Sequence, residues 1–391
     1  MAEETVLVIG AGPAGLACAY YLEQANITYR VVDQADVVGS TWASLYPSLR
    51  LNTTRFYSHL PGRRFPLSYG IFPTGRQYHR YLVEYARAHN FNIHLAVTVY
   101  CARPERGGWW VETSEGAAWY PALISATGRF CSPYTPPIPG MRSFRGRLLH
   151  AHDYLGPEPF ADQRVMVVGN GPSGVDIATE LGAWADPPVL LAQRTGVVLR
   201  PRYPWGLPKH VWMMICDALP ERLARPLDRK IADLKFEDLD ALGIKTPQNE
   251  TDSTAAGGTR GRELIEAVRA GRVRSVECPV RFHEDCVELA DGSCAVVDAV
   301  IVATGYRPAL FRYLDLGPVE TNKDGWPLRV DEPPGDVSAG RRQVKGFPGL
   351  YLVGVFYQGK GAMYNFNTEA AAAVEEIQAH LATRRENGSA E

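Results

Sequence analysis

Two short glycine-rich sequences constrain the fold of this chain more than any other feature. The first is Gly10-Ala11-Gly12-Pro13-Ala14-Gly15, and it directly follows the apolar run Val6 to Ile9. The second, residues 169–174, reads GNGPSG and follows the apolar run Val165 to Val168. A stretch of helical character comes after each. Strand, G-x-G-x-x-G and helix in this order is typical of a dinucleotide-binding β-α-β unit.

Each glycine of such a fingerprint has its own task. The first allows a tight turn, the second lets a pyrophosphate approach the backbone, and the third lets the helix lie close to the strand. The N-terminus of the helix adds unpaired N–H groups and a positive dipole end. A single match is often an ordinary glycine turn, but two copies in the same context predict two dinucleotide sites.

The residues that follow the second strand of each unit differ in charge. After the first fingerprint, the strand-like run 29–32 ends at Asp33 and Gln34, about twenty residues beyond the glycines, where an acid can bind ribose hydroxyls. The corresponding place after the second fingerprint holds Gln193, Arg194 and Thr195, with no acid. A cation suits a 2′-phosphate, so the second site should prefer NADPH. An arginine that is merely solvated at a strand end is the alternative.

Length and charge narrow the class of protein. The 391 residues suffice for two domains with cores of their own. The 41 basic and 43 acidic residues form no charge block, which argues against nucleic acid or an anionic membrane as partner. The first strand begins at residue 6, leaving no room for a signal peptide, and no apolar run has the length of a membrane span. We therefore expect a cytoplasmic protein.

The seven cysteines include no C-x-x-C pair. Cys278, Cys286 and Cys294 recur at a spacing of eight, but metal sites use tighter pairs and no histidine cluster accompanies them. We interpret these three as packing residues, expect reduced thiols, and predict no metal site. The missing dithiol also argues against the disulfide-reductase branch of two-dinucleotide flavoproteins.

A longer motif directly precedes the second fingerprint. It reads Phe144-x-Gly146-x-x-x-His150-x-x-x-Tyr154 and matches the identifying motif of flavin-containing monooxygenases. Over nearly its whole length the chain resembles class B flavoprotein monooxygenases, and it is most similar to their short, YUCCA-like or bacterial group. The tract Leu242-Gly243-Ile244-x-x-Pro247 adds to the likeness to YUCCA-like proteins.

The resemblance implies an α/β fold with two Rossmann-like dinucleotide-binding domains. An FAD domain would comprise residues 1–158 and 301–391. An NADPH domain would be inserted between them at 159–300, with a helical and loop insertion at about 200–262. We expect this insertion to cover the active site and shape the substrate pocket; a plain surface excursion is the alternative.

The resemblance also assigns residues to the cofactors. The segment from Gly39 to Trp42 is similar to the family's G-G-x-W, and the family places the FAD adenine against the end of the strand expected at 93–99. Two A-T-G sequences mark crossovers between the domains. Val355 stands where related flavoproteins often carry an acid, and Gln358 is a substitute. The full set of expected cofactor contacts is Gly10, Gly12, Pro13, Ala14, Gly15, Asp33, Gln34, Ser40, Thr41, Trp42, Leu51, Asn52, Val99, Thr127, Gly128, Gly169, Gly171, Pro172, Ser173, Gly174, Arg194, Thr195, Ala303, Thr304, Gly305 and Gln358.

Asn52 is the one residue to which we assign a catalytic role. The resemblance places an Asn or His at this position, near the flavin and the nicotinamide. A carboxamide can donate and accept hydrogen bonds at once, which suits a group that holds a reduced-oxygen adduct without protonating it. Asn is also a common turn residue, and this is the alternative.

Two dinucleotide sites on one chain imply that one nucleotide reduces the other. Without a dithiol, O2 is the acceptor that the chain favours. The resemblance implies FAD and NADPH as cofactors, a C4a-(hydro)peroxyflavin, and transfer of one oxygen atom to a small organic substrate. Both N- or S-oxygenation and attack on a carbonyl or 2-oxo acid stay open, as does assembly into a homodimer.

Three alternatives belong to other classes of protein. An NADPH oxidase or flavin reductase of the same fold would release hydrogen peroxide. A redox-sensing nucleotide binder would not turn over, and an electron-transfer reductase would serve a partner protein. No internal repeat is seen beyond the two fingerprints.

Hydrophobic periodicity predicts several further elements. They are helices at 77–89, 211–219, 221–242, 263–269 and 369–383, strands at 93–99, 109–113, 118–120, 189–191, 295–302 and 349–354, and a loop at 249–261. Asn365, Asn367 and Thr368 are the candidate caps of the last helix.

Overall fold

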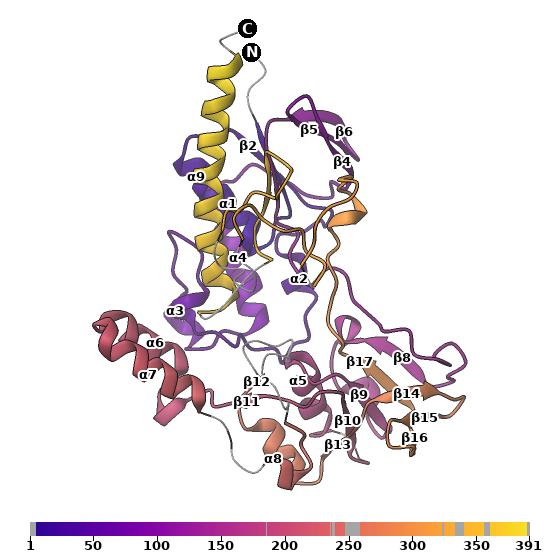
Figure 1. Ribbon diagram of the computed structural model, residues 1–391. Helices are drawn as coiled ribbons and strands as arrows, with labels where there is room; N and C mark the ends of the chain where they lie inside the picture. Colours follow the sequence, from indigo (N-terminus) through magenta and orange to yellow (C-terminus); the bar gives the residue numbers. More distant parts are fainter. Residues whose placement is uncertain are drawn as a thin grey trace. The chain divides into compact units, whose positions relative to one another are not determined.

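The computed structural model describes residues 5–184, 186–234, 236, 239–246, 259–322, 324–332, 340–355 and 360–388. The chain divides into two compact units (Figure 1). Unit 1 contains residues 1–44, 49–132 and 306–391, and unit 2 contains residues 45–48 and 133–305.

Unit 1 is built on a five-stranded parallel sheet in the order β18-β7-β1-β2-β3. Its strands are β1 (Val6–Ile9), β2 (Tyr29–Val32), β3 (Ile93–His94), β7 (Leu123–Ser125) and β18 (Leu350–Leu352). Successive side chains of β1 alternate between two cores: Val6 and Val8 pack with the helices on one face, and Leu7 and Ile9 pack with the residues on the other.

The helices of unit 1 are α1 (Pro13–Gln24), α2 (Ser40–Ala43), α3 (Arg55–Ser58), α4 (Gly75–His89) and α9 (Ala362–Gly388). The long α9 packs along α1 (Figure 1). The predicted helix at 77–89 is confirmed as α4. It starts earlier because Thr74 and Gln77 form a capping box, in which each side chain accepts from the other residue's backbone N–H.

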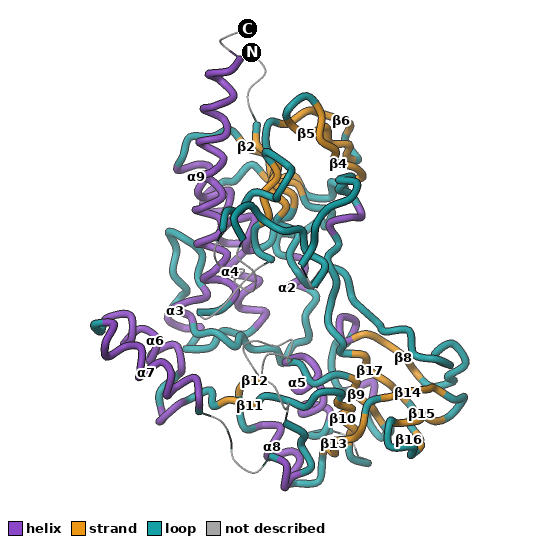
Figure 2. The backbone as a smooth tube through the Cα atoms, viewed as in Figure 1, coloured by secondary structure: helices purple, strands orange, loops and turns teal. Residues whose placement is uncertain are grey.

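A three-stranded antiparallel sheet completes unit 1. It consists of β4 (Val99–Glu105), β5 (Gly108–Thr113) and β6 (Gly116–Tyr120), and it confirms the predicted hairpin. Trp109 of β5 is fully buried against Leu7 and Ile9 of the parallel sheet. Between the 3-10 turn at Leu310–Arg312 and β18, the described backbone is loop with isolated bridges (Figure 2).

Unit 2 repeats this plan with a parallel sheet in the order β13-β10-β9-β17-β8. Its strands are β8 (Arg147–His150), β9 (Val165–Val168), β10 (Val189–Gln193), β13 (Val273–Glu277) and β17 (Ala299–Val302). The pair β9 and β10 corresponds to β1 and β2, and β17 corresponds to β7. Each sheet therefore places its fingerprint loop beside the strand that ends in A-T-G.

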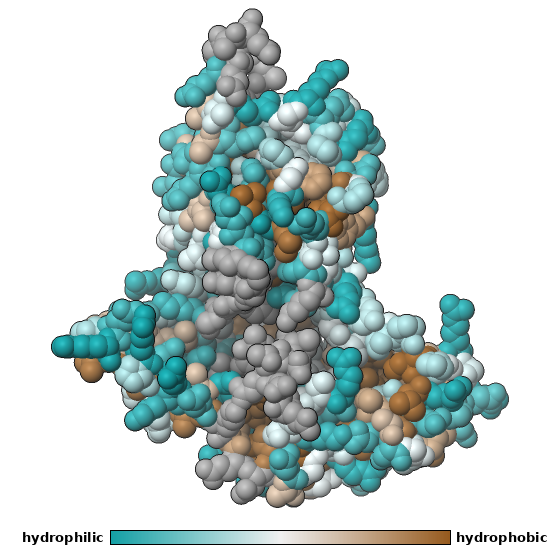
Figure 3. All heavy atoms as spheres, viewed as in Figure 1, coloured by the Kyte–Doolittle hydropathy of each residue, from teal (hydrophilic) through white to brown (hydrophobic). Residues whose placement is uncertain are grey.

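The remaining elements of unit 2 surround this sheet. They are the helices α5 (Pro172–Leu181), α6 (Lys209–Ala218), α7 (Glu221–Asp233) and α8 (Glu263–Arg269), the short pair β11 (Leu199–Arg200) and β12 (Thr259–Arg260), and the antiparallel β14 (Pro279–Phe282), β15 (Cys286–Leu289) and β16 (Cys294–Val296). On the face drawn in Figure 3, most side chains are hydrophilic, and apolar side chains gather in small groups between them.

The predicted domain boundaries need correction. Residues 133–158 belong to unit 2 because β8 pairs in parallel with β17, and the second boundary lies after residue 305. The tract before the fingerprint contributes an edge strand, a role that its short sequence, with two leucines between Arg147 and His150, does not reveal.

Several predicted elements also have different bounds. The strand expected at 93–99 is wrong, because the chain leaves the sheet after His94 and Ala96 takes a positive φ of 56°. The strand expected at 295–302 is two strands, β16 and β17. The helix expected at 221–242 ends at Asp233. The loop expected at 249–261 contains β12, while residues 249–258 lie outside the described residues.

The last helix begins earlier than predicted. Because α9 starts at Ala362, the candidate caps Asn365, Asn367 and Thr368 lie inside it. The Asn367 side chain instead donates to the backbone oxygen of His59, 2.8 Å away. A polar residue in the first turns of a helix therefore serves a neighbouring loop here.

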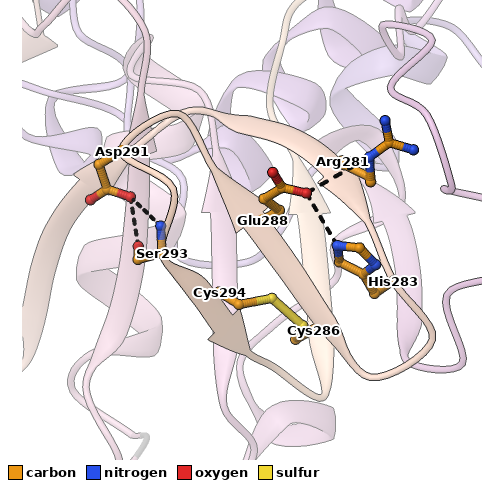
Figure 4. Close-up of a disulfide and its surroundings, with 7 residues drawn as sticks. All are labelled: Arg281, His283, Cys286, Glu288, Asp291, Ser293 and Cys294. Atoms are coloured by element: carbon orange, nitrogen blue, oxygen red, sulfur yellow. Dashed lines mark hydrogen bonds and ion pairs between the residues drawn. A yellow bond between two sulfur atoms is a disulfide. The ribbon is translucent and has the colours of Figure 1, made fainter.

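The prediction that all cysteines are reduced is also wrong. Cys286 and Cys294 form a disulfide between β15 and β16, with their Cα atoms 6.0 Å apart (Figure 4). The two residues are diagonal neighbours, since Cys294 pairs with Glu288 and Cys286 with Val296. Their eight-residue spacing reflects a tight hairpin, which brings the two cysteines together. The other five cysteines are free thiols.

Candidate functional site

The first fingerprint brings three backbone segments into close contact. Gly10 has a φ of +111°, and a Cβ at this position would lie 2.5 Å from the oxygen of Ala126. A Cβ on Gly15 would lie 1.8 Å from the oxygen of Gly10. Only glycine fits at both positions. At Gly12, in contrast, a Cβ would meet nothing within 4 Å, so the middle of the loop borders open space.

The second fingerprint has the same geometry. Gly169 has a φ of +123°, and its Cβ would lie 2.3 Å from the oxygen of Ala303. A Cβ on Gly174 would lie 2.0 Å from the oxygen of Gly169, and one on Gly171 would meet nothing within 4 Å. The alanine of each A-T-G therefore abuts the first glycine. Ala126, which the sequence prediction left out, takes the same place as Ala303.

Both fingerprint helices present their N-termini without a side-chain cap. Gly12 is the N-cap of α1 and Gly171 that of α5, and Pro13 and Pro172 begin the two helices. A proline at this position removes an N–H that would have no partner in the helix. The remaining N–H groups of the first turn and the helix dipole can receive the anionic pyrophosphate of a dinucleotide.

Asp33 holds the first fingerprint loop. Its Oδ2 atom accepts from the backbone N–H of Ala11 at 2.7 Å, and its Oδ1 atom accepts from that of Ala35 at 2.9 Å. Burial raises the pKa of Asp33, while these two hydrogen bonds oppose the rise. A carboxylate has about four acceptor positions, so two stay open to ribose hydroxyls. Gln34, the next residue, is exposed.

Two backbone hydrogen bonds join residues 96 and 97 to the segment 33–35. Ala96 N–H donates to the oxygen of Ala35, and Val97 N–H donates to the oxygen of Asp33. The residue placed against Asp33 is thus Val97, which is buried, whereas the predicted Val99 begins β4. The sequence of residues 93–99 predicts one continuous strand and does not indicate this turn.

The predicted segment at Ser40, Thr41 and Trp42 forms the short helix α2. Gly39 precedes it in the left-handed conformation and donates its N–H to the oxygen of Ala11 at 3.0 Å. Trp42 packs edge-on against Tyr78 with ring centres 4.4 Å apart. The segment is therefore fastened both to the fingerprint loop and to α4.

The segment around the predicted catalytic residue is anchored on both sides. Leu51 is buried and donates its N–H to the oxygen of Pro73 at 2.9 Å. Next to it, the Asn52 side chain is exposed. Thr53 adjoins Gly361 directly before α9, since a Cβ on that glycine would lie 2.3 Å from a Thr53 methyl group. The exposed Asn52 therefore lies next to a residue that contacts the start of α9. Its catalytic role stays a prediction.

Backbone register identifies the counterpart of Asp33 in unit 2. Gly10 donates to the oxygen of Val32 at 2.8 Å, and Gly169 donates to the oxygen of Ala192 at 3.0 Å. Gln193 therefore occupies the place of Asp33. Its side chain is fully buried, and no hydrogen-bond partner for it occurs within the described part of the chain. A neutral amide replaces the acid here.

Arg194 and Thr195 follow Gln193 and are both exposed. Behind them, Gly196 lies against the backbone of residues 245 and 246, and its oxygen accepts from the Asn170 side chain inside the fingerprint. The segment that carries Arg194 and Thr195 is therefore hydrogen-bonded to the second fingerprint loop. The predicted cation thus stands beside the second nucleotide loop.

His150 of the longer motif has a defined tautomer. Its Nδ1 atom accepts from the N–H of His152 at 3.0 Å, so Nε2 carries the proton and donates to the oxygen of Gly305 at 3.2 Å. Burial lowers the pKa of His150, which favours this neutral form. His150 therefore holds the last residue of the second A-T-G in place.

Tyr154 of the same motif fixes the fingerprint helix. This buried residue donates its hydroxyl to Glu180 Oε2 on α5 at 2.9 Å. The motif thus holds both parts of the second nucleotide loop, the crossover through His150 and the helix through Tyr154. Thr304 in the crossover donates to the oxygen of Tyr134 at 2.5 Å.

The other predicted crossover residues flank the loops. Gly128 and Gly305 both have positive φ and border open space, at +75° and +86°. Thr127 follows β7 and is half-buried, and Ser173 is exposed in the first turn of α5. Gln358 lies outside the described residues.

Asp176 is an acid that sequence reasoning did not single out. It lies one turn into α5, and burial raises its pKa to about 6. The charge of Arg202 and a hydrogen bond from Tyr46 oppose the rise, whereas the nearby Glu263 and Glu180 add to it. Glu180 lies one turn beyond Asp176 on α5. Tyr46, Arg202 and Glu263 come from other segments of unit 2, so no sequence spacing brings all five residues together.

Comparison with known proteins agrees with this geometry. The model of the pyridine nucleotide-disulphide oxidoreductase family matches residues 7–197. YUCCA1 of Arabidopsis thaliana, a probable indole-3-pyruvate monooxygenase, is 30% identical over 367 residues, which cover 90% of this chain and 85% of the relative. YUCCA8 of the same plant is 29% identical, with 98% and 92% covered. The chain is a class B flavoprotein monooxygenase.

Solved structures of this family share the fold. The flavin-containing monooxygenase from Stenotrophomonas maltophilia superposes with a TM-score of 0.74 at 24% identity, covering 97% of this chain and 99% of that one. Cyclohexanone monooxygenase from Rhodococcus sp. Phi1, bound to NADP+, gives 0.67 at 16% identity, with 96% and 84% covered. A flavin monooxygenase uses flavin and a pyridine nucleotide, which suits the two loops described above.

The described residues contain neither a membrane-spanning helix nor a cluster of metal ligands. No helix in them has both the length and the apolarity needed to cross a bilayer. No group of three or more His, Cys, Asp or Glu side chains in the same residues could hold a metal ion.

The open middle glycines give a first prediction. Gly12→Ala should leave the fold intact, because its added methyl meets no protein atom, yet weaken FAD binding about tenfold by filling the space beside the loop. Gly171→Ala should leave FAD binding unchanged and raise the KM for NADPH by a similar factor. Fluorescence titration of FAD and steady-state kinetics measure the two effects. Equal loss of FAD from both variants would contradict separate sites.

The environment of Asp176 gives a second prediction. Because its folded pKa of about 6 exceeds the ordinary value of 3.8, its contribution to stability is fully present below about pH 4 and is lost as the pH rises through about 6. Asp176→Asn should therefore raise the Tm at pH 8 and have no such effect at pH 4. Differential scanning calorimetry tests this, with the exposed Asp228→Asn as control. A lower Tm at pH 8 would refute it.

Proposed function

We propose that this protein is an FAD- and NADPH-dependent monooxygenase that oxygenates a small 2-oxo acid with loss of CO2. The observation that carries the proposal is the doubled fingerprint, with an acid beside one loop and a cation beside the other. The substrate class is supported by relatives named indole-3-pyruvate monooxygenases, of which one is 30% identical over 90% of this chain.

The proposed overall reaction balances with one equivalent of each reagent. A 2-oxo acid R–CO–COOH, O2, NADPH and H+ give R–COOH, CO2, NADP+ and H2O. One oxygen atom of O2 enters the new carboxylic acid, and the other is reduced to water by the hydride of NADPH and the proton. The bound flavin supplies the redox chemistry, accepting the hydride and delivering its electrons to O2.

The residues of unit 1 would hold FAD. The N-terminus of α1 at Gly12 faces the pyrophosphate, and the open acceptor positions of Asp33 bind the adenosine ribose. Ser40, Thr41 and Trp42 line the flavin side, and Asn52 orients the reacting oxygen as donor and acceptor. No protein nucleophile is required.

The residues of unit 2 would hold NADPH. The N-terminus of α5 at Gly171 receives the pyrophosphate, and Arg194 with Thr195 receives the 2′-phosphate. Gln193, uncharged at the place of Asp33, does not repel that phosphate. His150 and Tyr154 keep the loop in position and take no part in proton transfer.

The remaining expectations rest on the sequence alone. They are the cytoplasmic location, the homodimer, and an insertion at 200–262 that shapes the substrate pocket. Oxygenation of nitrogen or sulfur, which the sequence leaves open, stays the second candidate. One solved structural neighbour is an S-allyl-L-cysteine S-oxygenase from Allium sativum. That neighbour is 18% identical and supports the fold alone.

Product analysis tests the proposed function. The holoenzyme with NADPH and an aryl 2-oxo acid, such as phenylpyruvate or indole-3-pyruvate, should give one arylacetate and one CO2 per NADPH consumed. With 18O2, one labelled atom should appear in the acid. A thioether and a tertiary amine serve as competing substrates. Hydrogen peroxide equal to the NADPH consumed, with every substrate, would instead identify an NADPH oxidase.

The nucleotide preference has its own test. Arg194→Ala should raise the KM for NADPH about tenfold or more, because a charge-assisted bond to the 2′-phosphate is lost, and should hardly change the KM for NADH. Steady-state kinetics with both nucleotides measure this, with the exposed Arg274→Ala as control. An equal rise for both nucleotides would overturn the assignment.

A further inference from the structure

The turn that follows β18 rests on the first fingerprint. Gly354 directly follows this part of the sheet with a φ of +85°, and a Cβ there would lie 2.4 Å from the Cβ of Ala14 in the first turn of α1. The backbone at Gly354 therefore touches the loop to which we assign the FAD pyrophosphate. A shift of this turn would shift the surface that the cofactor meets.

A buried acid from a distant part of the chain holds this turn. Glu369 of α9 is 4% exposed, and its Oε2 atom accepts from the N–H of Gly354 at 3.0 Å. Its Oε1 atom accepts from Arg329 Nη1 at 2.9 Å, and Arg329 is 1% exposed. Both carboxylate oxygens are thus used, one for the turn and one for the ion pair.

Arg329 is itself held in the loop before β18. Its backbone N–H donates to Glu332 Oε2 at 3.1 Å, and its Nε atom lies 3.5 Å from the same oxygen. Arg342, from the same loop, adds positive charge near Glu369. Burial raises the pKa of Glu369, and Arg329, Gly354 and Arg342 oppose that rise, which favours the ionised acid.

Stability alone does not explain such a pair. Removing two charges from water costs about as much as their attraction returns, and apolar residues often replace a buried pair without loss. Such a pair does impose one geometry, because each hydrogen bond fixes a direction.

We propose that Glu369, oriented by Arg329, is the positioning residue that sets the turn at Gly354 against the first fingerprint for FAD binding. Glu369 would act on the turn through the backbone N–H of Gly354 and not through direct contact with the cofactor. This inference rests on the proposed FAD site of unit 1 and adds to it two residues that no sequence motif marks.

Replacing both Arg329 and Glu369 with apolar residues separates an effect on FAD binding from an effect on the stability of the fold. In the double variant Arg329→Met with Glu369→Leu, both charges of the pair are removed and Glu332 keeps the hydrogen bond from the backbone N–H of residue 329, so the apoprotein should keep a Tm near that of wild type. FAD should nevertheless bind about tenfold more weakly, because the bond to Gly354 is lost. The exposed Glu375→Gln on the same helix is the matched control.

A second variant covers the case in which the double variant does not fold. Glu369→Gln keeps the size of the side chain and one oxygen for Gly354, and Arg329 keeps Glu332 as a carboxylate partner. Because the bond to Gly354 is retained, the FAD Kd of this variant should stay within about threefold of that of wild type. The KM for NADPH of the FAD-loaded enzyme should not change.

The outcomes are distinct. An FAD Kd for the folded double variant within about twofold of wild type, or an FAD Kd for Glu369→Gln as weak as that expected for the double variant, would overturn the positioning role. Wild-type protein that binds no FAD would instead overturn the proposed function itself.

Discussion

Helix and strand touch through their backbones at the third glycine of each fingerprint, and the rest of the structure depends on this contact. The oxygen of Gly10 occupies the space that a side chain at Gly15 would need, and Gly169 and Gly174 repeat the arrangement. Such an approach directs the N-terminus of the helix at the end of the sheet. The crossover strands contact the same loops from the other side: the backbone oxygen of the alanine in each A-T-G lies against the first glycine of the fingerprint.

The two units share one fold, although we assign different nucleotides to them. Strand order and loop geometry are the same in both, so the plan itself does not distinguish the nucleotides. The difference lies in one position of the register, where Asp33 in unit 1 corresponds to Gln193 in unit 2. An acid there favours ribose hydroxyls, and an amide followed by Arg194 suits a phosphate. In the proposed assignment, cofactor choice would depend on a few side chains at the edge of a common fold.

Polar residues outside the glycine loops keep these edges in place. In unit 2, His150 and Tyr154 reach the crossover and α5 from the edge-strand segment. In unit 1, Asp33 fastens the loop from within, and Glu369 reaches the turn at Gly354 from the last helix. All of these contacts use charge-assisted or directional hydrogen bonds, which fix orientation more than they add stability.

The sequence by itself determined the two β-α-β units, the helix at α4, the hairpin β5–β6 and the family, since short-range patterns encode them. Only the tertiary structure decided that β8 joins unit 2, that Val97 hydrogen-bonds to the backbone of Asp33, and that Cys286 pairs with Cys294. It also brought Glu369 to Gly354 and Asp176 to Arg202. Periodicity reports which face of an element is buried, whereas these contacts join residues far apart in the chain, and only packing fixes which of them meet.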